Sequence, residues 1–188
     1  MHIPRPGPIR RRVAVRTRVV LACVLLLRAA AAASDPVHPV ESRHPAVVVS
    51  AGTFALVEDY DYPYRVGLLY RFAAVTAWWL QPGVGAAFGP EGKTYLYVDL
   101  QRDFPLGDDW LVSPSLAAGY FANGDAVGVH GHVQFQSGIA LARRFERGRR
   151  IGLGVYHISN GGLDTPNNGT EAVVTFVRIP VGPVPRGR

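Results

Sequence analysis

The feature that most constrains this chain is a period-two alternation of apolar or aromatic residues, which begins after Pro45 and is broken at short intervals by turn residues. Such alternation predicts β-strands, because successive side chains on a strand point to opposite faces. No segment after Ser34 has helical periodicity, so the pattern predicts an all-β meander. The expected strands, about eight, span residues 46–57, 62–72, 77–88, 93–101, 110–121, 130–144, 150–159 and 171–179.

Two architectures suit such a meander, a soluble barrel or sandwich and a transmembrane barrel. Several of the expected strands reach about ten residues, the length that a tilted membrane-spanning strand needs. In the stretch from Gly131, aliphatic and aromatic residues (Val133, Phe135, Ile139, Leu141) share one face, and small or polar ones (His132, Gln134, Gln136, Gly138, Ala140) share the other. This division favours an eight-stranded antiparallel transmembrane β-barrel of the outer-membrane type, with the aliphatic face toward lipid. A soluble barrel with that face as its core remains the alternative.

Aromatic residues near the expected strand ends are typical of the interfacial girdles of such barrels. They are Tyr60, Tyr62, Tyr64, Trp78, Trp79, Trp110, Tyr120 and Phe121.

The two ends of the chain have other compositions. Residues 1–33 contain an arginine-rich start, an apolar run and an alanine tract, which together predict a cleaved secretory signal peptide. The single cysteine, Cys23, loosely fits a lipoprotein box, but the apolar run continues beyond it. Residues 34–45 are expected to form a solvated polar leader, residues 46–180 the barrel, and residues 181–188 a Pro-rich tail.

The formal charge of +6 does not indicate nucleic-acid binding. Seven of the 20 Lys and Arg residues lie before Ser34, where there is no acidic residue. The remaining 13 basic residues face 14 acidic ones, so the mature chain has no cationic excess. A cluster of arginines near residue 147 is expected to be a solvated turn; it consists of Arg143, Arg144, Arg147, Arg149 and Arg150.

The segment from Tyr156 to Glu171 carries the residue types of a nucleophilic hydrolase. His157 and Ser159 project from the aliphatic face of one expected strand, and Glu171 opens the next strand. If the two strands pair as a hairpin, the carboxylate falls near the imidazole. A serine nucleophile needs an adjacent base, and a carboxylate can orient that base. These residues could also be ordinary interfacial side chains, although polar groups on a lipid-facing surface are costly unless they pair or serve a function.

The His-x-Ser-Asn segment is followed by Asn-Asn-Gly-x-Glu, whose Glu lies twelve residues after the serine, and this pattern resembles the PagL family of lipid A 3-O-deacylases. The resemblance extends to the signal peptide, the length and the strand-rich mature chain. It implies an eight-stranded barrel with the nucleophile Ser159, the general base His157 and the orienting residue Glu171 on its exterior. It further implies oxyanion donors at Gly162 and Asn167. Asn160 would shape the loop.

The implied activity is that of an outer-membrane serine esterase that hydrolyses the 3-O-linked 3-hydroxyacyl chain of lipid A in a Gram-negative bacterium. Its partner would be lipopolysaccharide in the outer leaflet. It would need no cofactor and no metal ion, and a homodimer is left open. The alternatives are a non-catalytic outer-membrane barrel with an adhesive or structural role, and a soluble lipid-binding barrel. The Pro-rich tail departs from the usual pattern of outer-membrane barrels, because these barrels usually end on an aromatic residue.

Overall fold

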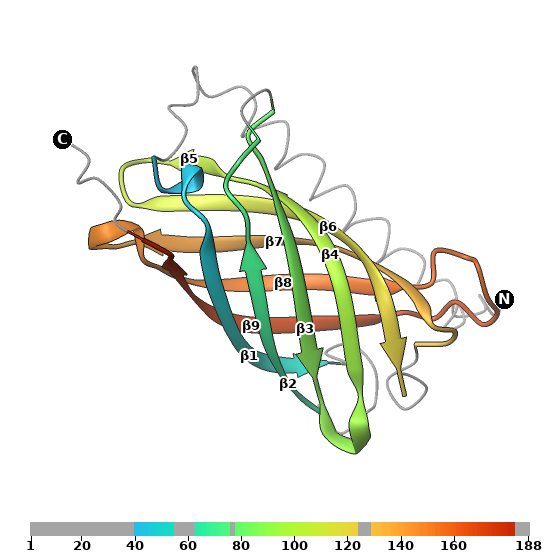
Figure 1. Ribbon diagram of the computed structural model, residues 1–188. Coiled ribbons are helices and arrows are strands. Elements are labelled where there is room, and N and C mark those ends of the chain that lie inside the picture. Colours follow the sequence, from blue (N-terminus) through green and yellow to red (C-terminus); the bar gives the residue numbers. More distant parts are fainter. Residues whose placement is uncertain (1–39, 55–62, 76–77, 124–128, 183–188) are drawn as a thin grey trace, which may run out of the picture. The chain divides into compact units, whose positions relative to one another are not determined.

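The computed structural model describes residues 40–54, 63–75, 78–123 and 129–182, all within the compact unit Val37–Arg188 (Figure 1). The expected signal peptide, Tyr60 and Tyr62 lie outside these residues. No helix among the described residues is long and apolar enough to cross a membrane.

The described elements are strands and short 3-10 helices. The strands are β1 (Ala46–Phe54), β2 (Tyr64–Arg71), β3 (Leu80–Phe88), β4 (Thr94–Arg102), β5 (Phe104–Leu106), β6 (Trp110–Ala122), β7 (Val133–Arg144), β8 (Arg150–Ser159) and β9 (Thr170–Pro180). Short 3-10 helices are η1 (Val40–Arg43), η2 (Pro90–Gly92) and η4 (Glu146–Gly148).

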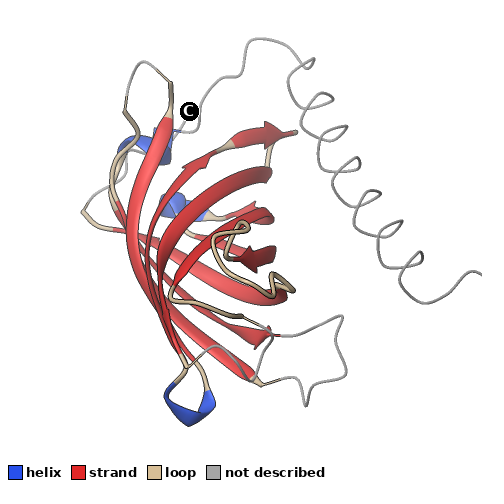
Figure 2. Cartoon of the chain, turned by 90° about the vertical axis from the view of Figure 1, so that its right-hand side faces the viewer, coloured by secondary structure: helices blue, strands red, loops and turns tan. Residues whose placement is uncertain are grey.

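Eight of these strands close an antiparallel barrel (Figures 1 and 2). Strands β1 to β4 pair in sequence, β4 pairs with β6, β6 to β9 pair in sequence, and β9 returns to β1. Closure matters because lipid offers no hydrogen-bond partner to an open strand edge. The predicted eight-stranded barrel is therefore confirmed. The short strand β5, which pairs with β6, was not predicted.

The aliphatic face points outward. On β7, Val133, Phe135 and Leu141 are exposed, and on β8 the same is true of Leu153 and Val155. An apolar outer wall is what a bilayer requires and what water disfavours. The soluble barrel with this face as its core is therefore excluded.

The aromatic girdle prediction holds in part. Tyr64, Trp78, Trp110 and Tyr120 are exposed at strand ends. Phe121 was wrongly included: it is 1% exposed and packs inside the barrel. The reason is the alternation itself, because Tyr120 takes the outward position and its neighbour must point inward.

The inside of the barrel is filled by an apolar cluster at one end and by polar and charged side chains elsewhere. At the end that holds the β8–β9 loop, here called the loop end, the interior is an apolar cluster that includes Phe54, Tyr95 and Phe121. Further along the interior are the buried ion pair of Arg71 with Asp99 and a cavity of about 50 Å³. A cavity of this size holds at most a few water molecules. The interior is therefore packed and does not form an open pore.

The opposite end, here called the η1 end, is closed by a buried polar network around Asp103. Its carboxylate accepts hydrogen bonds from Ser42 of η1 at 2.8 Å, Ser113 at 2.8 Å and Arg150 at 2.6 Å. Gln81 and Gln101 donate two more, each at 2.7 Å. Burial raises the pKa of Asp103, but the charge of Arg150 and the hydrogen bonds from Arg150, Ser113 and Gln81 outweigh burial and lower the pKa below its ordinary value. Asp103 therefore stays ionised inside the protein.

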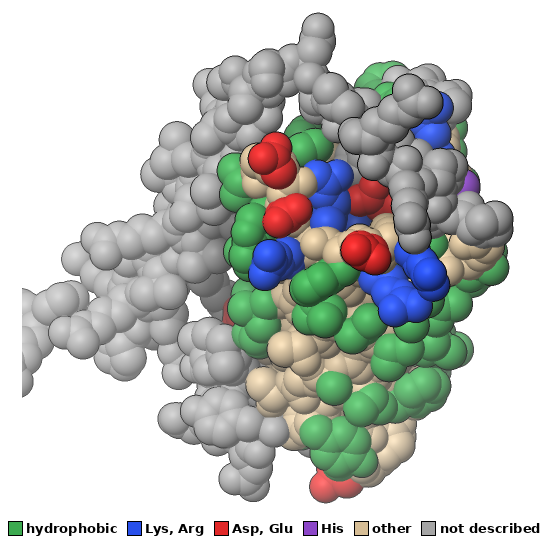
Figure 3. Space-filling model, turned by 90° about the vertical axis from the view of Figure 1, so that its left-hand side faces the viewer, with side chains coloured by type: hydrophobic (Ala, Val, Ile, Leu, Met, Phe, Trp, Pro, Cys, Tyr) green, Lys and Arg blue, Asp and Glu red, His purple; other side chains and the backbone are tan. Residues whose placement is uncertain are grey.

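This network corrects two expectations. Arg150 was expected in a solvated turn, yet it is 1% exposed and paired with Asp103. Glu41 and Ser42, expected in a solvated leader, are also buried, because η1 folds into the end of the barrel. The exposed members of the arginine cluster are Arg143, Arg147 and Arg149. Figure 3 shows basic and acidic side chains gathered on one part of the surface.

Replacing Asp103 by Asn should destabilise the barrel by about 3 kcal/mol, because the buried charge of Arg150 loses its carboxylate partner at 2.6 Å and is left with the more distant Glu41, whose Oε1 lies 3.4 Å from Nη2. The matched control is Asp109→Asn, which removes an exposed carboxylate lying 3.7 Å from Arg143. The control should cost less than about 1 kcal/mol. Urea unfolding of both variants in lipid vesicles measures the difference. Equal destabilisation by the two variants would contradict the structural role of the network.

Candidate functional site

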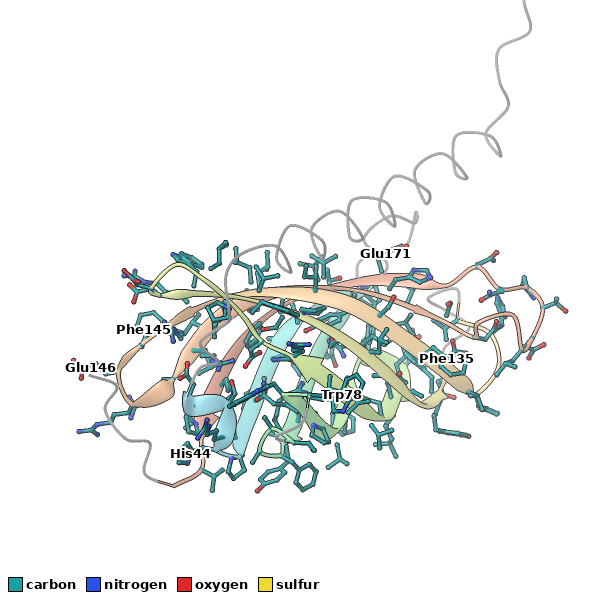
Figure 4. All side chains as sticks on the ribbon, turned by 90° about the horizontal axis from the view of Figure 1, so that it is seen from above. His44, Trp78, Phe135, Phe145, Glu146 and Glu171 are labelled. Carbon is teal, nitrogen blue, oxygen red and sulfur yellow. The ribbon has the colours of Figure 1, made fainter. Side chains whose placement is uncertain are left out.

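The β8–β9 hairpin brings His157 and Glu171 directly opposite each other across the ladder. Nδ1 of His157 lies 3.2 Å from Oε1 of Glu171. Glu171 lies toward the loop end, in the same half of the barrel as Phe135, whereas Phe145 and Glu146 lie at the η1 end (Figure 4). The hairpin expected from the sequence is formed, with the two residues in register.

The contact with Glu171 suits one tautomer of the imidazole. When Glu171 is ionised, its carboxylate can only accept a hydrogen bond, and Nδ1 of His157 is then the donor. In a neutral ring with the proton on Nδ1, the lone pair is on Nε2, which is the atom a general base uses. This tautomer is the one that proton abstraction requires.

Ser159 lies on the same outward face of β8, two residues beyond His157. Their Cα atoms are separated by about 6.6 Å, the rise of two strand residues. No hydrogen bond joins Ser159 Oγ to the imidazole among the described side chains. Catalytic hydrogen bonds are often long without substrate and tighten when it binds. The geometry thus joins two of the three predicted residues directly and positions the third beside them.

The imidazole rests against the backbone of Gly169, the residue just before β9. A Cβ added at Gly169 would lie 2.8 Å from Cε1 and 3.1 Å from Nε2 of His157. Gly169 also has a φ of +71°, a conformation that side-chain-bearing residues rarely adopt. The position therefore needs glycine both for the backbone turn and for the ring. The motif contained this glycine, but its role depends on the ring orientation, which the sequence does not give.

Asn160 organises the loop that follows Ser159. It is 2% exposed, and its Nδ2 donates to the carbonyl oxygens of His130 at 3.2 Å and Asp164 at 3.0 Å. Its Oδ1 accepts a hydrogen bond from the amide of Gly162 at 2.8 Å. The Asn160 carboxamide thus links this loop to the residues just before β7. It also links residues within the loop to one another.

The two residues expected to bind the oxyanion are in the same loop. The amide of Gly162 is occupied by Asn160 Oδ1, and the side chain of Asn167 is exposed. Among the described residues, the structure forms no hydrogen bond between the Asn167 side chain and a protein group. In this structure, therefore, no contact holds the Gly162 amide or the Asn167 side chain in place beside Ser159.

The site is set in an apolar wall. Val155 and Val173 pair with each other one step further from the loop end, and Val155 is 43% exposed. The side chains of His157 and Glu171 are 43% and 28% exposed, so both reach the outer surface. An imidazole–carboxylate pair on a lipid-facing surface can take a proton where an ester carbonyl can approach from the membrane.

The described part of the chain has no group of three or more His, Cys, Asp or Glu side chains arranged to hold a metal ion. His132 stacks on Tyr120 with ring centroids 4.8 Å apart. Its Nδ1 lies 3.2 Å from the carbonyl oxygen of Phe121, to which it can only donate. His132 therefore helps to fasten the start of β7 to the end of β6.

Comparisons with solved structures agree with the barrel. The crystal structure of the outer membrane enzyme PagL superposes with a TM-score of 0.57 at 19% identity, covering 72% of this chain and 99% of that chain. A de novo designed transmembrane β-barrel gives 0.49 at 18% identity, covering 74% and 96%. The Yersinia pestis outer membrane protein Ail gives 0.43 at 16% identity, covering 72% and 99%. At these identities only the first likeness carries an argument, and it concerns the fold alone.

Among curated proteins, no sequence matches the chain. The family match is specific: residues 63–180 match the family described as lipid A 3-O-deacylase (PagL). This match covers more than half of the chain and includes the hairpin with His157, Ser159 and Glu171. Together with the eight-stranded barrel and its apolar outer wall, it shows that the chain belongs to the PagL family of outer-membrane lipid A 3-O-deacylases.

Proposed function

We propose that this protein is a serine esterase that releases the 3-O-linked 3-hydroxyacyl chain from lipid A in the outer leaflet of the outer membrane. Ser159 is the nucleophile, His157 the general base and Glu171 the residue that orients the base. The observation that supports this most strongly is the hydrogen bond of His157 to Glu171 on the lipid-facing wall, with Ser159 on the same face of the same strand.

In the first half of the reaction, Ser159 Oγ attacks the carbonyl carbon of the ester while Nε2 of His157 takes the hydroxyl proton. The bond between the carbonyl carbon and the sugar oxygen then breaks. The imidazolium returns its proton to that oxygen, which leaves as the 3-hydroxyl of the sugar. Glu171 stabilises the imidazolium while it exists. The acyl chain remains on Ser159 as an ester.

In the second half, His157 takes a proton from a water molecule whose oxygen attacks the acyl-enzyme carbonyl. The carbon–oxygen bond to Ser159 breaks, and the imidazolium protonates Oγ. The products are the free 3-hydroxy fatty acid and the original serine. No oxidant, reductant or cation is consumed, so the chain's own residues supply every group that moves a proton.

Each tetrahedral intermediate carries a negative oxygen that hydrogen-bond donors must stabilise. We assign this role to the amide of Gly162 and the side chain of Asn167. The Gly162 amide donates to Asn160 Oδ1 at 2.8 Å in the free protein, so it must exchange that acceptor for the oxyanion. Asn160 keeps the loop folded through its Nδ2 while this exchange takes place.

The serine assignment predicts that Ser159→Ala and His157→Ala each reduce deacylation by at least about 10³-fold, while Glu171→Ala retains roughly ten times more activity than His157→Ala. Mass spectrometry of lipid A from expressing cells measures the loss of the acyl chain. Heat-dependent mobility on gels checks that each variant is folded. Wild-type deacylation by Ser159→Ala would overturn the assignment.

The contact of the imidazole with Gly169 predicts that Gly169→Ala lowers activity on the order of a hundredfold, because the added Cβ displaces the ring from its working position. Gly107→Ala is the matched control: its φ is +70°, but nothing lies within 4 Å of the added Cβ. Both variants carry the same backbone strain, so they differ in the contacts of the added Cβ, which at Gly169 meets the His157 ring and the backbone oxygen of Ile158 at 2.9 Å. Equal activities of the two variants would show that the ring position does not depend on Gly169.

The proposed substrate is in the outer leaflet, so the β8–β9 loop must face the cell exterior. An impermeant thiol reagent applied to whole cells should label Thr165→Cys and leave Arg147→Cys unlabelled, because the two residues lie at opposite ends of β8. Labelling of Arg147→Cys alone would reverse the orientation of the barrel and separate the site from lipid A.

A further inference from the structure

A single hydroxyl interrupts the apolar outer row of β7. The outward residues of this strand include Val133, Phe135, Ile139 and Leu141, and between them lies the exposed Ser137. Among the described residues, the structure forms no hydrogen bond between the Ser137 side chain and a protein group. A hydroxyl that faces lipid without a partner is unfavourable, because hydrocarbon offers it no hydrogen bond. The position of Ser137 relative to the site indicates that its hydrogen-bond partner is a group of the substrate.

Ser137 is the cross-strand partner of His157, in the same row as Glu171 on the other side. Ser159 is opposite Phe135, so Ser137 is also its diagonal neighbour. Directly opposite residues have Cβ atoms about 5 Å apart, and diagonal neighbours are about 7–8 Å apart. Ser137 is therefore the nearest outward position on β7 to the base and, after Phe135, the nearest to the nucleophile.

The imidazole leaves the β7 side of the site open. Its Nδ1 bonds to Glu171, and its Cε1 and Nε2 rest on Gly169, both of which are on the β9 side. On the β7 side the small Ser137 stands between the larger Phe135 and Ile139. An acyl chain whose carbonyl is at Ser159 and whose tail runs toward the bilayer centre can pass over Ser137 and then along Ile139 and Val155, which pair with each other.

The third carbon of that acyl chain is two carbon–carbon bonds, about 2.5 Å, from the carbonyl carbon. Along this path it lies part of the way from Ser159 to the row of Ser137 and His157, which is about 6.6 Å nearer the bilayer centre along the strand. A hydroxyl on the third carbon extends further in this direction and comes within reach of the hydroxyl of Ser137. Each can donate to or accept from the other, and neither has a competing partner in the hydrocarbon region.

We propose that Ser137 is a specificity-determining residue whose side chain hydrogen-bonds the 3-hydroxyl of the acyl chain to be released. The proposal rests on the proposed function, since it assumes that Ser159 attacks this ester. It deepens that function by giving the enzyme a means to distinguish a 3-hydroxyacyl ester from an unsubstituted acyl ester. The discrimination arises because an unsubstituted chain leaves the Ser137 hydroxyl unpaired.

The test uses two synthetic lipid A molecules that are identical except for the 3-hydroxyl on the acyl chain at position 3. The wild-type barrel in mixed micelles should hydrolyse the hydroxylated molecule with a kcat/KM about five- to tenfold higher, the effect of one neutral hydrogen bond. In Ser137→Ala the ratio should fall to about one, because only the rate on the hydroxylated molecule decreases. Ser137→Thr keeps the hydroxyl and should retain most of the preference.

Thr175→Val is the matched control. Thr175 also presents an outward hydroxyl on the lipid-facing wall, but it donates to the carbonyl oxygen of Ala51 and is on β9. Removing it should leave the substrate ratio unchanged. A ratio unaltered by Ser137→Ala, or equal loss on both substrates, would overturn the proposal, since the first outcome excludes contact with the hydroxyl and the second indicates a purely structural role.

A binding experiment separates this proposal from the proposed function. The Ser159→Ala protein, which should bind without turnover, is titrated with both lipid A molecules, and its Kd should favour the hydroxylated one by a similar factor. Introducing Ser137→Ala into this background should remove the preference. If the wild-type protein hydrolyses lipid A but binding shows no preference for the hydroxylated molecule, the role of Ser137 is overturned and the esterase function stands. If the wild-type protein hydrolyses neither molecule but binds the hydroxylated one more tightly in a way that depends on Ser137, the role of Ser137 stands and the esterase function is overturned.

Discussion

The pairing of β9 with β1 is the constraint on which the rest of the structure depends. Each backbone amide and carbonyl in the hydrocarbon region needs a partner from the chain itself, and a sheet achieves this only by closing on itself. The two strands pair over nine residues, from Ala46 with Pro180 to Phe54 with Ala172. Once the ring has eight strands, its interior is just wide enough for side chains to fill. Closure therefore determines both the apolar outer wall and the packed interior.

The packed interior in turn determines where chemistry can occur. Buried ion pairs of Arg71 with Asp99 and of Arg150 with Asp103, together with the apolar cluster at the loop end, leave a cavity of only about 50 Å³. A lipid cannot enter such a space. The groups that we propose act on the ester are on the outer surface of the barrel, where β8 and β9 hold the imidazole and the carboxylate in register. The stiffness of a paired strand positions these groups more firmly than a loop alone would.

The sequence predicted those parts that follow from alternation. Leu153, Val155 and His157 could be assigned to one face, and the hairpin register then brought Glu171 opposite His157. Features that depend on three-dimensional neighbours could not be predicted. The burial of Arg150 requires knowledge of where Asp103 lies, and the role of Asn160 requires the position of His130, thirty residues earlier. Phe121 was misassigned because adjacent aromatic residues were treated as one girdle, although they point to opposite faces.

The outward position of His157 and Glu171 also governs how substrate reaches the site. A residue on the outer wall meets only molecules that diffuse laterally within the same leaflet, so encounters take place in two dimensions. The quantity that sets occupancy is then the mole fraction of substrate among the surrounding lipids, and the bulk concentration of lipid in a suspension is irrelevant. Dilution of the leaflet with inert lipid slows such an enzyme, while dilution of whole vesicles with buffer leaves its rate per molecule unchanged.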